Sequence, residues 1–277
     1  MRRLCVLTTL CAIFLWNGSA FAQQGQWGGF IYLIPKDGIA LSAEKRESVA
    51  KTLEKEISCF SNDYTPEKGQ LETVLFCKGV EYSLDGKPLS SRVPTGLIRV
   101  ESLTRAKIDK FHKSLYLALN DYFDIEYRIS VTRELMYTDA ATLGRLKTNA
   151  PTRGNGKDQP NAVILPLTKT TAWWAMPLDK RKQYFDKSPE TLGKAQMGHN
   201  EVGFMYIKSI FRKLYHSRFI DDGQDFMTHF EFSDSDIDAF KALMNGLRDK
   251  ETNPEWGFVQ EKPMFWGKRV ISLAEIL

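Results

Sequence analysis

The chain has 277 residues, of which 38 are basic and 34 acidic, and 12% of its residues are aromatic. Neither a basic tract nor a basic face is evident, so the charge pattern argues against nucleic acid or an anionic membrane as a partner. The length allows one large domain or two smaller ones, and composition does not choose between them.

The start of the chain has the composition of a secretory signal over residues 1–22. Arg2 and Arg3 precede an apolar run, Leu4–Trp16, and small residues then lead to Ala22. This order predicts cleavage before Gln23. The apolar run is shorter than the roughly 20 residues that a membrane span needs. We therefore predict an exported, periplasmic chain without a membrane anchor, in which 36 basic residues stand against 34 acidic ones.

Two of the four cysteines, Cys5 and Cys11, would leave with the signal. Cys59 and Cys77 remain, in a compartment that is oxidising. We therefore predict a disulfide between them. The sequence has no CxxC pair, which argues against a zinc or redox site.

The segment after the signal alternates between expected strands and helices. Apolar runs bounded by turn residues predict strands, and Glu- and Lys-rich segments with helical periodicity predict helices. The expected strands are 26–36, 71–84, 95–103 and 125–137, and the expected helices are 42–58 and 106–122. Residues 146–161 are rich in Pro, Gly and Asn and carry no periodicity, so we expect a loop there.

A similar pattern follows this loop. The expected strands are 162–170, 201–217, 225–232 and 258–263, and the expected helices are 174–187, a short one ending near His199, and 233–251. A strand–helix–strand–strand–helix–strand order is typical of ferredoxin-like units. The sequence thus predicts an α+β fold with two such halves, 23–150 and 162–277, joined by a linker at 151–161. The halves would pack sheet to sheet as a dimeric α+β barrel.

The common hydrolase and nucleotide-binding motifs are missing from the sequence, which has no GxSxG, HExxH, P-loop or helix-opening GxGxxG. The remaining candidates are polar residues in apolar surroundings, above all His199 and Arg212. A strand over 201–217 would carry Arg212 roughly 35–40 Å along the chain, at about 3.3 Å per residue. The chain could then reverse and bring Arg212 to the far side of a ligand of His199. The alternatives are a histidine at a helix end and a strand-edge cation that reaches water.

Several segments together resemble one known family. They are WWAMPLDKR, the histidine at 199, RKLYHSRFIDD, DFMTHFEF and DAFKALMNGLR, within residues 160–270. These segments look like the C-terminal half of chlorite dismutase, a haem b enzyme that converts chlorite to chloride and dioxygen. The resemblance implies a haem b cofactor, chlorite as the small-molecule substrate, and assembly as a homopentamer.

The resemblance also assigns roles to single residues. His199 matches the proximal ligand of the haem iron, and Arg212 matches the distal arginine above it. Glu251 matches the glutamate that accepts the other N–H of the proximal histidine, where a carboxylate would fix the imidazole and strengthen its bond to iron. These three residues would form the iron site.

Other matched residues would surround the haem. Trp173 and Trp174 match tandem tryptophans beside it, and Tyr137 matches a tyrosine that contacts a propionate. His216 falls in a motif that resembles a structural corner of the family, so we expect no chemistry from it. The sequence departs from the pattern in a longer segment around 186–197. It also has Gln260 where the family often has a tryptophan, although Trp256 and Trp266 flank this position.

Three alternative interpretations remain. A haem-synthesis branch of the same superfamily acts on coproporphyrin in the cytoplasm and lacks the distal arginine, so Arg212 and the signal argue against it. An exported haem-binding protein with peroxidase-like activity would need nearly the same residues as a chlorite dismutase. An α+β binding module without a cofactor would make the match around His199 and Arg212 a coincidence.

Overall fold

The computed structural model describes residues 25–65, 70–150, 154–187 and 196–277. The expected signal at 1–22 lies outside these residues, as do positions 188–195 of the longer segment. Within the described part of the chain, no helix is long and apolar enough to cross a membrane.

The N-terminal half combines long strands with two helices. The strands are β1 (Trp27–Pro35), β3 (Thr73–Leu84), β5 (Gly96–Ser102) and β6 (Phe123–Val131), with the short strands β2 (Ser61–Asn62) and β4 (Lys87–Pro88). The helices are α1 (Ala43–Ile57) and α2 (Arg105–Leu119), and α3 (Ala140–Asn149) follows β6. Helix α1 begins at Ser42, whose side chain accepts a hydrogen bond from the N–H of Lys45.

The C-terminal half also combines strands with helices, and three short helices of the described residues lie between its first two strands. Its strands are β7 (Asn161–Lys169), β8 (Phe211–His216), β9 (Phe226–Phe232), β10 (Val259–Glu261) and β11 (Met264–Val270). Its helices are α4 (Thr171–Ala175), α5 (Leu178–Lys182), α6 (Gly198–Phe204) and α7 (Ile237–Arg248). Short 3-10 turns lie at Asp234–Asp236, Pro254–Phe258 and Leu273–Glu275.

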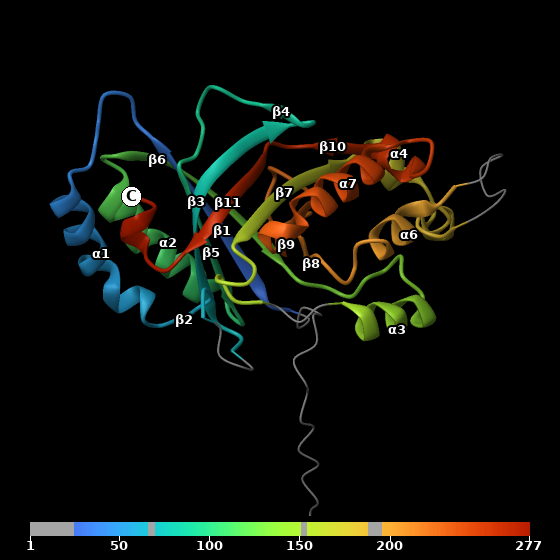
Figure 1. Ribbon diagram of the computed structural model, residues 1–277, viewed down its shortest axis with the longest axis horizontal. Helices are drawn as coiled ribbons and strands as arrows, with labels where there is room; N and C mark the ends of the chain where they lie inside the picture. The colour runs from blue at the N-terminus through green and yellow to red at the C-terminus, as the bar shows by residue number, and fades with distance from the viewer. Residues whose placement is uncertain (1–24, 66–69, 151–153, 188–195) are drawn as a thin grey trace, which may run out of the picture.

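Strands from both halves form one 11-stranded sheet, which confirms the predicted α+β class (Figure 1). The main path runs β10-β7-β11-β3-β5-β1-β6-β8-β9, and β7 also pairs with β9. Because β7 pairs with both β11 and β9, the sheet closes on itself. Helices α1 and α2 cover it on the N-terminal side, and α6 and α7 cover it on the C-terminal side (Figure 1).

Apolar side chains gather in three clusters that follow this arrangement. One cluster lies between the N-terminal strands and α1 and α2, and a second lies between the C-terminal strands and α7. The third fills the inside of the closed sheet and includes Phe30, Leu75, Ile164, Tyr215 and Phe265. Burial of an aliphatic or phenylalanine side chain stabilises a fold by about 1.5–3 kcal/mol. The third cluster, whose members come from both halves, therefore helps to hold the halves together.

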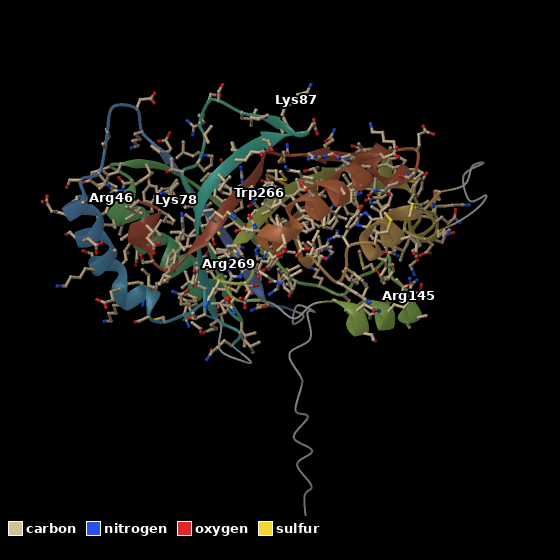
Figure 2. All side chains as sticks on the ribbon, viewed as in Figure 1. Arg46, Lys78, Lys87, Arg145, Trp266 and Arg269 are labelled. Carbon is tan, nitrogen blue, oxygen red and sulfur yellow. The ribbon has the colours of Figure 1, made fainter. Side chains whose placement is uncertain are left out.

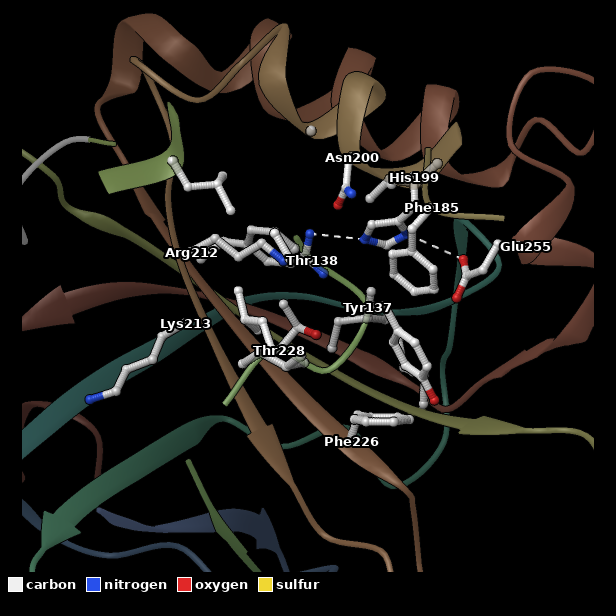
Figure 3. A pocket seen from close by; sticks show the side chains of 18 of the residues that line it. Tyr137, Thr138, Phe185, His199, Asn200, Arg212, Lys213, Phe226, Thr228 and Glu255 are labelled. Atoms are coloured by element: carbon white, nitrogen blue, oxygen red, sulfur yellow. Dashed lines mark hydrogen bonds and ion pairs between the residues drawn. The ribbon is translucent and has the colours of Figure 1, made fainter. Parts of the chain in front are cut away.

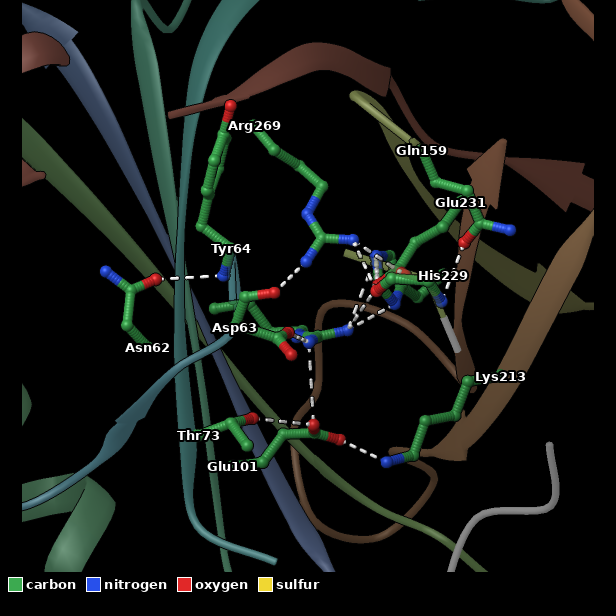
Figure 4. Close-up of polar contacts among 12 residues, drawn as sticks. Asn62, Asp63, Tyr64, Thr73, Glu101, Gln159, Lys213, His229, Glu231 and Arg269 are labelled. Atoms are coloured by element: carbon green, nitrogen blue, oxygen red, sulfur yellow. Dashed lines mark hydrogen bonds and ion pairs between the residues drawn. The ribbon is translucent and has the colours of Figure 1, made fainter. Parts of the chain in front are cut away.

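A buried cluster of charged side chains also lies inside the closed sheet (Figure 4). We call it the barrel cluster, and its ionic members are three cations and three carboxylates: Arg99, Lys213, Arg269, Asp63, Glu101 and Glu231. Arg99 pairs with Asp63 and lies 3.5 Å from Glu101 and 3.6 Å from Glu231. Figure 2 places Arg269 in the middle of the molecule, whereas the exposed Lys87 projects at its edge.

The pKa values of the barrel cluster reflect this crowding. Burial alone would raise the pKa of Glu101, but Lys213 and Arg99 lower it to about 2. For Glu231, burial outweighs the neighbouring arginines and raises the pKa to about 7. Since both groups are fully buried, each depends on its partners inside the protein rather than on water.

The segment after His199 differs from the predicted strand at 201–217. Helix α6 runs to Phe204, turns follow, and within this segment only Phe211–His216, which form β8, are a strand. Val202, Tyr206 and Ile210 recur every four residues and pack in the cluster with residues of α7, a spacing that suits a helix as well as an alternating strand. His199 therefore lies in the first turn of a helix, not at the end of one.

Two further elements were not predicted. Helix α3 extends to Asn149 and so covers the start of the expected loop at 146–161; Asp139 caps it by accepting from the N–H of Thr142 at 2.8 Å. Strand β11 lies between β3 and β7 and thus joins the two halves of the sheet.

The predicted disulfide between Cys59 and Cys77 is wrong, because both thiols are free. Cys77 lies in β3 and points to the inside of the closed sheet, whereas Cys59 is exposed just beyond α1. The side chains thus face different environments. Burial raises the pKa of the Cys77 thiol to about 12, which leaves it protonated at neutral pH.

Candidate functional site

A cavity of about 230 Å³ lies between the C-terminal strands and the helices that cover them (Figure 3). Strands β7, β8 and β9 line one side, and α6 and α7 line the other. Most of the lining is apolar and includes Leu165, Phe230, Leu243 and Trp256. A mainly apolar cavity with a few convergent polar groups is typical of a ligand-binding site.

The backbone before His199 requires glycine. Gly198 has φ +76°, and a Cβ at this position would lie 2.5 Å from the carbonyl oxygen of Asp186. A residue with a side chain would therefore be strained in conformation and would also collide with backbone. This turn starts α6 and directs His199 into the cavity (Figure 3).

The neighbours of His199 determine which of its ring nitrogens carries the proton. Nδ1 lies 3.2 Å from Oε2 of Glu255, and Nε2 lies 3.1 Å from Nη1 of Arg212 (Figure 3). A carboxylate only accepts and a guanidinium only donates, so Nδ1–H donates to Glu255 and Nε2 accepts from Arg212. Burial lowers the pKa of His199 well below its usual range, and the charges of Arg212 and Lys169 lower it further. The imidazole is therefore neutral, with the Nε2 lone pair toward the cavity.

Arg212 reaches the cavity because of the alternation of β8. Arg212 and Leu214 face the cavity, whereas Lys213 and Tyr215 extend to the barrel cluster and the inside of the closed sheet. Burial lowers the pKa of Arg212 to about 10, so the guanidinium still carries its charge at neutral pH. It is a cation in an apolar site, where its attraction for an anion is stronger than in water.

A second buried basic residue, Lys169, completes a chain of polar contacts behind His199. Burial lowers the pKa of Lys169 well below its usual range, and the charge of Arg212 lowers it further. The Nζ of Lys169 forms an ion pair with Oε1 of Glu255, whose other oxygen accepts from His199. The same Nζ lies 4.5 Å from the centre of the Trp173 ring, a cation–π contact. Lys169 thus holds Glu255, and Glu255 holds the ring of His199.

The structure corrects the prediction that Glu251 is the carboxylate beside His199. Glu251 is exposed in the turn after α7, where its N–H donates to Asp249 at 3.0 Å. Asn253 ties this turn down, since its N–H donates to the carbonyl oxygen of Asp249 and its amide donates to that of Leu247. The 3-10 turn that follows carries Glu255, which is 2% exposed, into the place expected for Glu251.

The predicted aromatic residues lie around the cavity at different depths. Tyr137 lines it, stacks on Phe185 at 4.7 Å between ring centres, and accepts a hydrogen bond from Arg181. Trp173 is fully buried behind Tyr137, at 5.8 Å between ring centres. Trp174 stacks on the lining residue Phe226 and donates from Nε1 to Asp225 at 3.0 Å. The structure thus brings all three near His199 and Arg212, but only Tyr137 contacts the cavity itself.

The remaining positions singled out in the sequence divide between the cavity and the core. His216, expected to have a structural role, lines the cavity. Gln260 is exposed on β10. Of the tryptophans beside it, Trp256 lines the cavity and Trp266 is buried, donating to Asn161 at 3.1 Å.

Sequence reasoning missed Lys169 and Glu255. Lys169 ends an otherwise apolar strand, AVILPLTK, and a lysine at such a position is a usable signal for a buried pair. Glu255, in NPEWG, carries no such signal, because its inward direction depends on the turn before it.

Comparisons with known proteins bear on the family of the chain and on its fold. The family model described as chlorite dismutase matches residues 98–270. A structure of chlorite dismutase from Candidatus Nitrospira defluvii in complex with imidazole has a TM-score of 0.67 and 21% identity, and the match covers 92% of this chain and 94% of that one. A mutant of the same enzyme in complex with cyanide has a TM-score of 0.66, with the same identity and coverage. At this identity the two structures show the fold.

Proposed function

This chain belongs to the chlorite dismutase family, a family of haem oxidoreductases, and on that premise we propose that it binds haem b and decomposes chlorite to chloride and dioxygen. One observation carries the proposal. The Nε2 lone pair of a neutral histidine and the guanidinium of Arg212 meet inside one apolar cavity. The first group suits a metal, and the second suits an anion.

The donor set of the cavity fits a haem. Neutral imidazole is a common axial ligand of haem iron, and a carboxylate on its other nitrogen strengthens the bond to the metal. His199 would be the ligand and Glu255 its supporting carboxylate. The lone pair that accepts from Arg212 is the one that iron would take, so haem binding requires this hydrogen bond to break.

Further residues would hold the edge of the haem. Tyr137 and Arg181 offer a hydroxyl and a guanidinium 3.0 Å apart, a pair suited to a carboxylate such as a propionate. Trp173 and Trp174 would pack behind these groups and keep them in place. We also propose export to the periplasm and assembly as a homopentamer, as the sequence and its resemblance imply.

In the proposed reaction, haem iron would supply the redox chemistry, and the protein would bind, orient and confine the anion. Arg212, freed from His199, would hold chlorite by charge-assisted hydrogen bonds and keep the oxygen-containing fragment in the cavity. Leu165, Phe230 and other apolar residues would exclude water, which strengthens this attraction. Glu255 would accept the hydrogen bond from Nδ1–H of His199 throughout, and Lys169 would hold the carboxyl group of Glu255 in place.

An oxygen electrode tests the proposal. Chlorite added to the haem-loaded mature protein should release one dioxygen per chlorite consumed. Bleaching of the haem without dioxygen would contradict the proposed reaction. It would favour the alternative of an exported haem-binding protein with peroxidase-like activity.

A further inference from the structure

His216 is a buried histidine that the proposed reaction does not use. It is 8% exposed and lines the same cavity as Arg212. Within the described part of the chain, no donor or acceptor lies within hydrogen-bonding distance of its buried Nε2. Because buried polar groups are normally paired, an unpaired ring nitrogen at a cavity indicates a missing partner.

The position of His216 follows from the geometry of β8. Arg212, Leu214 and His216 alternate toward the cavity, and at about 3.3 Å per residue His216 lies about 13 Å along the strand from Arg212. The ring of His216 packs edge-on against Phe226, at 5.1 Å between ring centres. His216 therefore belongs to a different part of the cavity from His199, to which Arg212 is bound.

Arg133 adds a positive charge at this end of the cavity. It follows β6 two residues after Val131, which is paired with His216. Arg133 is exposed and also lines the cavity, so it lies where the cavity meets the surface. No carboxylate of the described residues forms an ion pair with it. Burial, with a smaller contribution from Arg133, lowers the pKa of His216 to about 4, so at neutral pH the ring is uncharged and the charge here is that of Arg133.

We propose that His216 and Arg133 form a second anion-binding site, at the opening of the cavity, for a carboxylate or a small oxyanion. The imidazole would donate its N–H from Nε2, and the guanidinium would supply the charge. Two sources have this chemistry: a carboxylate of the group bound in the cavity, and a free oxyanion on its way to Arg212. The site goes beyond the proposed reaction and does not depend on dioxygen release.

Nitrite, a bent oxyanion like chlorite, can test this site by NMR of the mature protein labelled with 15N-histidine. The His216→Gln variant identifies the ring signals of His216. At constant ionic strength, nitrite should shift these signals in a saturable manner. Arg133→Met should raise the dissociation constant for nitrite at least tenfold. Arg92→Met is the matched control, since it removes an exposed cation paired with Asp124, and it should bind nitrite like the wild type.

Zinc protoporphyrin and its dimethyl ester distinguish the two sources, because both are diamagnetic and only the first carries carboxylates. If the site holds a carboxylate of the bound group, zinc protoporphyrin abolishes the nitrite response of the His216 signals, whereas the ester leaves that response in place. If the site holds a free oxyanion, nitrite still shifts the signals after zinc protoporphyrin is bound.

The proposal is overturned if neither nitrite nor zinc protoporphyrin shifts the His216 signals. It is also overturned if Arg133→Met responds to both as the wild type does. These outcomes are separate from failure of the proposed reaction, because neither measurement involves chlorite turnover. Arg133 is exposed, so its replacement tests the site even where a change of the buried His216 alters folding.

Discussion

The protein has two groups of charged side chains, one inside the closed sheet and one lining the cavity, and they differ in how completely they are paired. In the barrel cluster three cations meet three carboxylates, and each lies within an ion pair. The lining of the cavity has Arg133, Lys169 and Arg212, and also Lys213, whose ammonium pairs with Glu101 in the barrel cluster. Glu255 is the only carboxylate among these lining residues. The charges of the barrel cluster are balanced within the protein, whereas the basic residues of the cavity lining outnumber its carboxylates, which suits an anionic ligand.

Strand β8 connects these two regions. Lys213 pairs with Glu101 in the barrel cluster, and its neighbour Arg212 reaches His199 in the cavity. Lys213 and Arg212 are adjacent in β8 and point to opposite faces of the strand. The ion pair of Lys213 holds the strand in place and so also positions Arg212. We therefore propose that the barrel cluster acts as a scaffold and that the cavity binds the ligand. The following predictions test this division.

The largest expected effect is on stability, from a break in the barrel cluster. Arg99→Met would leave Asp63 and its neighbouring carboxylates buried without their main cation. We expect a loss of about 3–5 kcal/mol in the free energy of unfolding, measured by urea denaturation. Arg92→Met, at an exposed pair, should change it by less than about 1 kcal/mol. Equal effects of the two changes would remove the argument that the barrel cluster is a scaffold.

Replacement of Arg212 should affect turnover instead of stability. Arg212→Gln removes the cation that would hold the anion, so dioxygen release should fall about 10²–10³-fold. Haem binding, followed by the absorbance of the Soret band, should persist. Arg145→Gln changes an exposed arginine of α3 paired with Glu201 and should leave turnover unchanged. Wild-type turnover in Arg212→Gln would contradict the assigned role.

Glu255 and Glu251 can be compared directly, since the structure and the sequence pattern assign the same role to different residues. Glu255→Gln should weaken haem binding about 10–100-fold, because the supporting carboxylate of the metal ligand is lost. Glu251→Gln should leave the affinity unchanged. A haem titration of both variants decides the matter, and the reverse order of effects would restore Glu251.

The smallest expected effect concerns acid. The pKa of Glu101 is about 2 in the folded protein, below its ordinary value of 4.5, so its contribution to stability is present above pH 4.5 and is lost as the pH falls toward 2. Between pH 6 and 3.5 this loss should be about 1 kcal/mol. Urea denaturation should show a smaller pH dependence for Glu101→Gln over this range. Parallel curves for the two proteins would mean that Glu101 titrates normally.

The strand pattern of the protein could largely be predicted from its sequence, because alternating and apolar runs are strong signals. The strands 26–36, 162–170 and 225–232 lie within a residue of where they were expected. The segment at 201–217 was misassigned because its apolar residues support two patterns. Val202, Tyr206 and Ile210 pack on one face as a helix would, and only packing against α7 decides between a helix and a strand there.

The site was only partly predictable, for a related reason. We expected His199 and Arg212 on opposite sides of one ligand. In the structure both line one cavity and are joined directly by a hydrogen bond, and a helix followed by turns, rather than a strand, separates them in the chain. The position of Glu255 depends on hydrogen bonds from Asn253 that close the turn after α7. The periodicity of the sequence does not indicate such contacts. The role of His216 depends on which face of β8 borders the cavity, which only the assembled fold reveals.

The most direct test of the central claim is a haem titration of the mature protein and of His199→Ala, followed by the absorbance of the Soret band. Our account predicts that the wild-type protein binds one haem per chain and that His199→Ala binds it at least about 100-fold more weakly, while urea denaturation shows that the variant is still folded. An unchanged affinity in the folded variant would show that the Nε2 lone pair of His199 is not the iron ligand, and the cavity would then need another function.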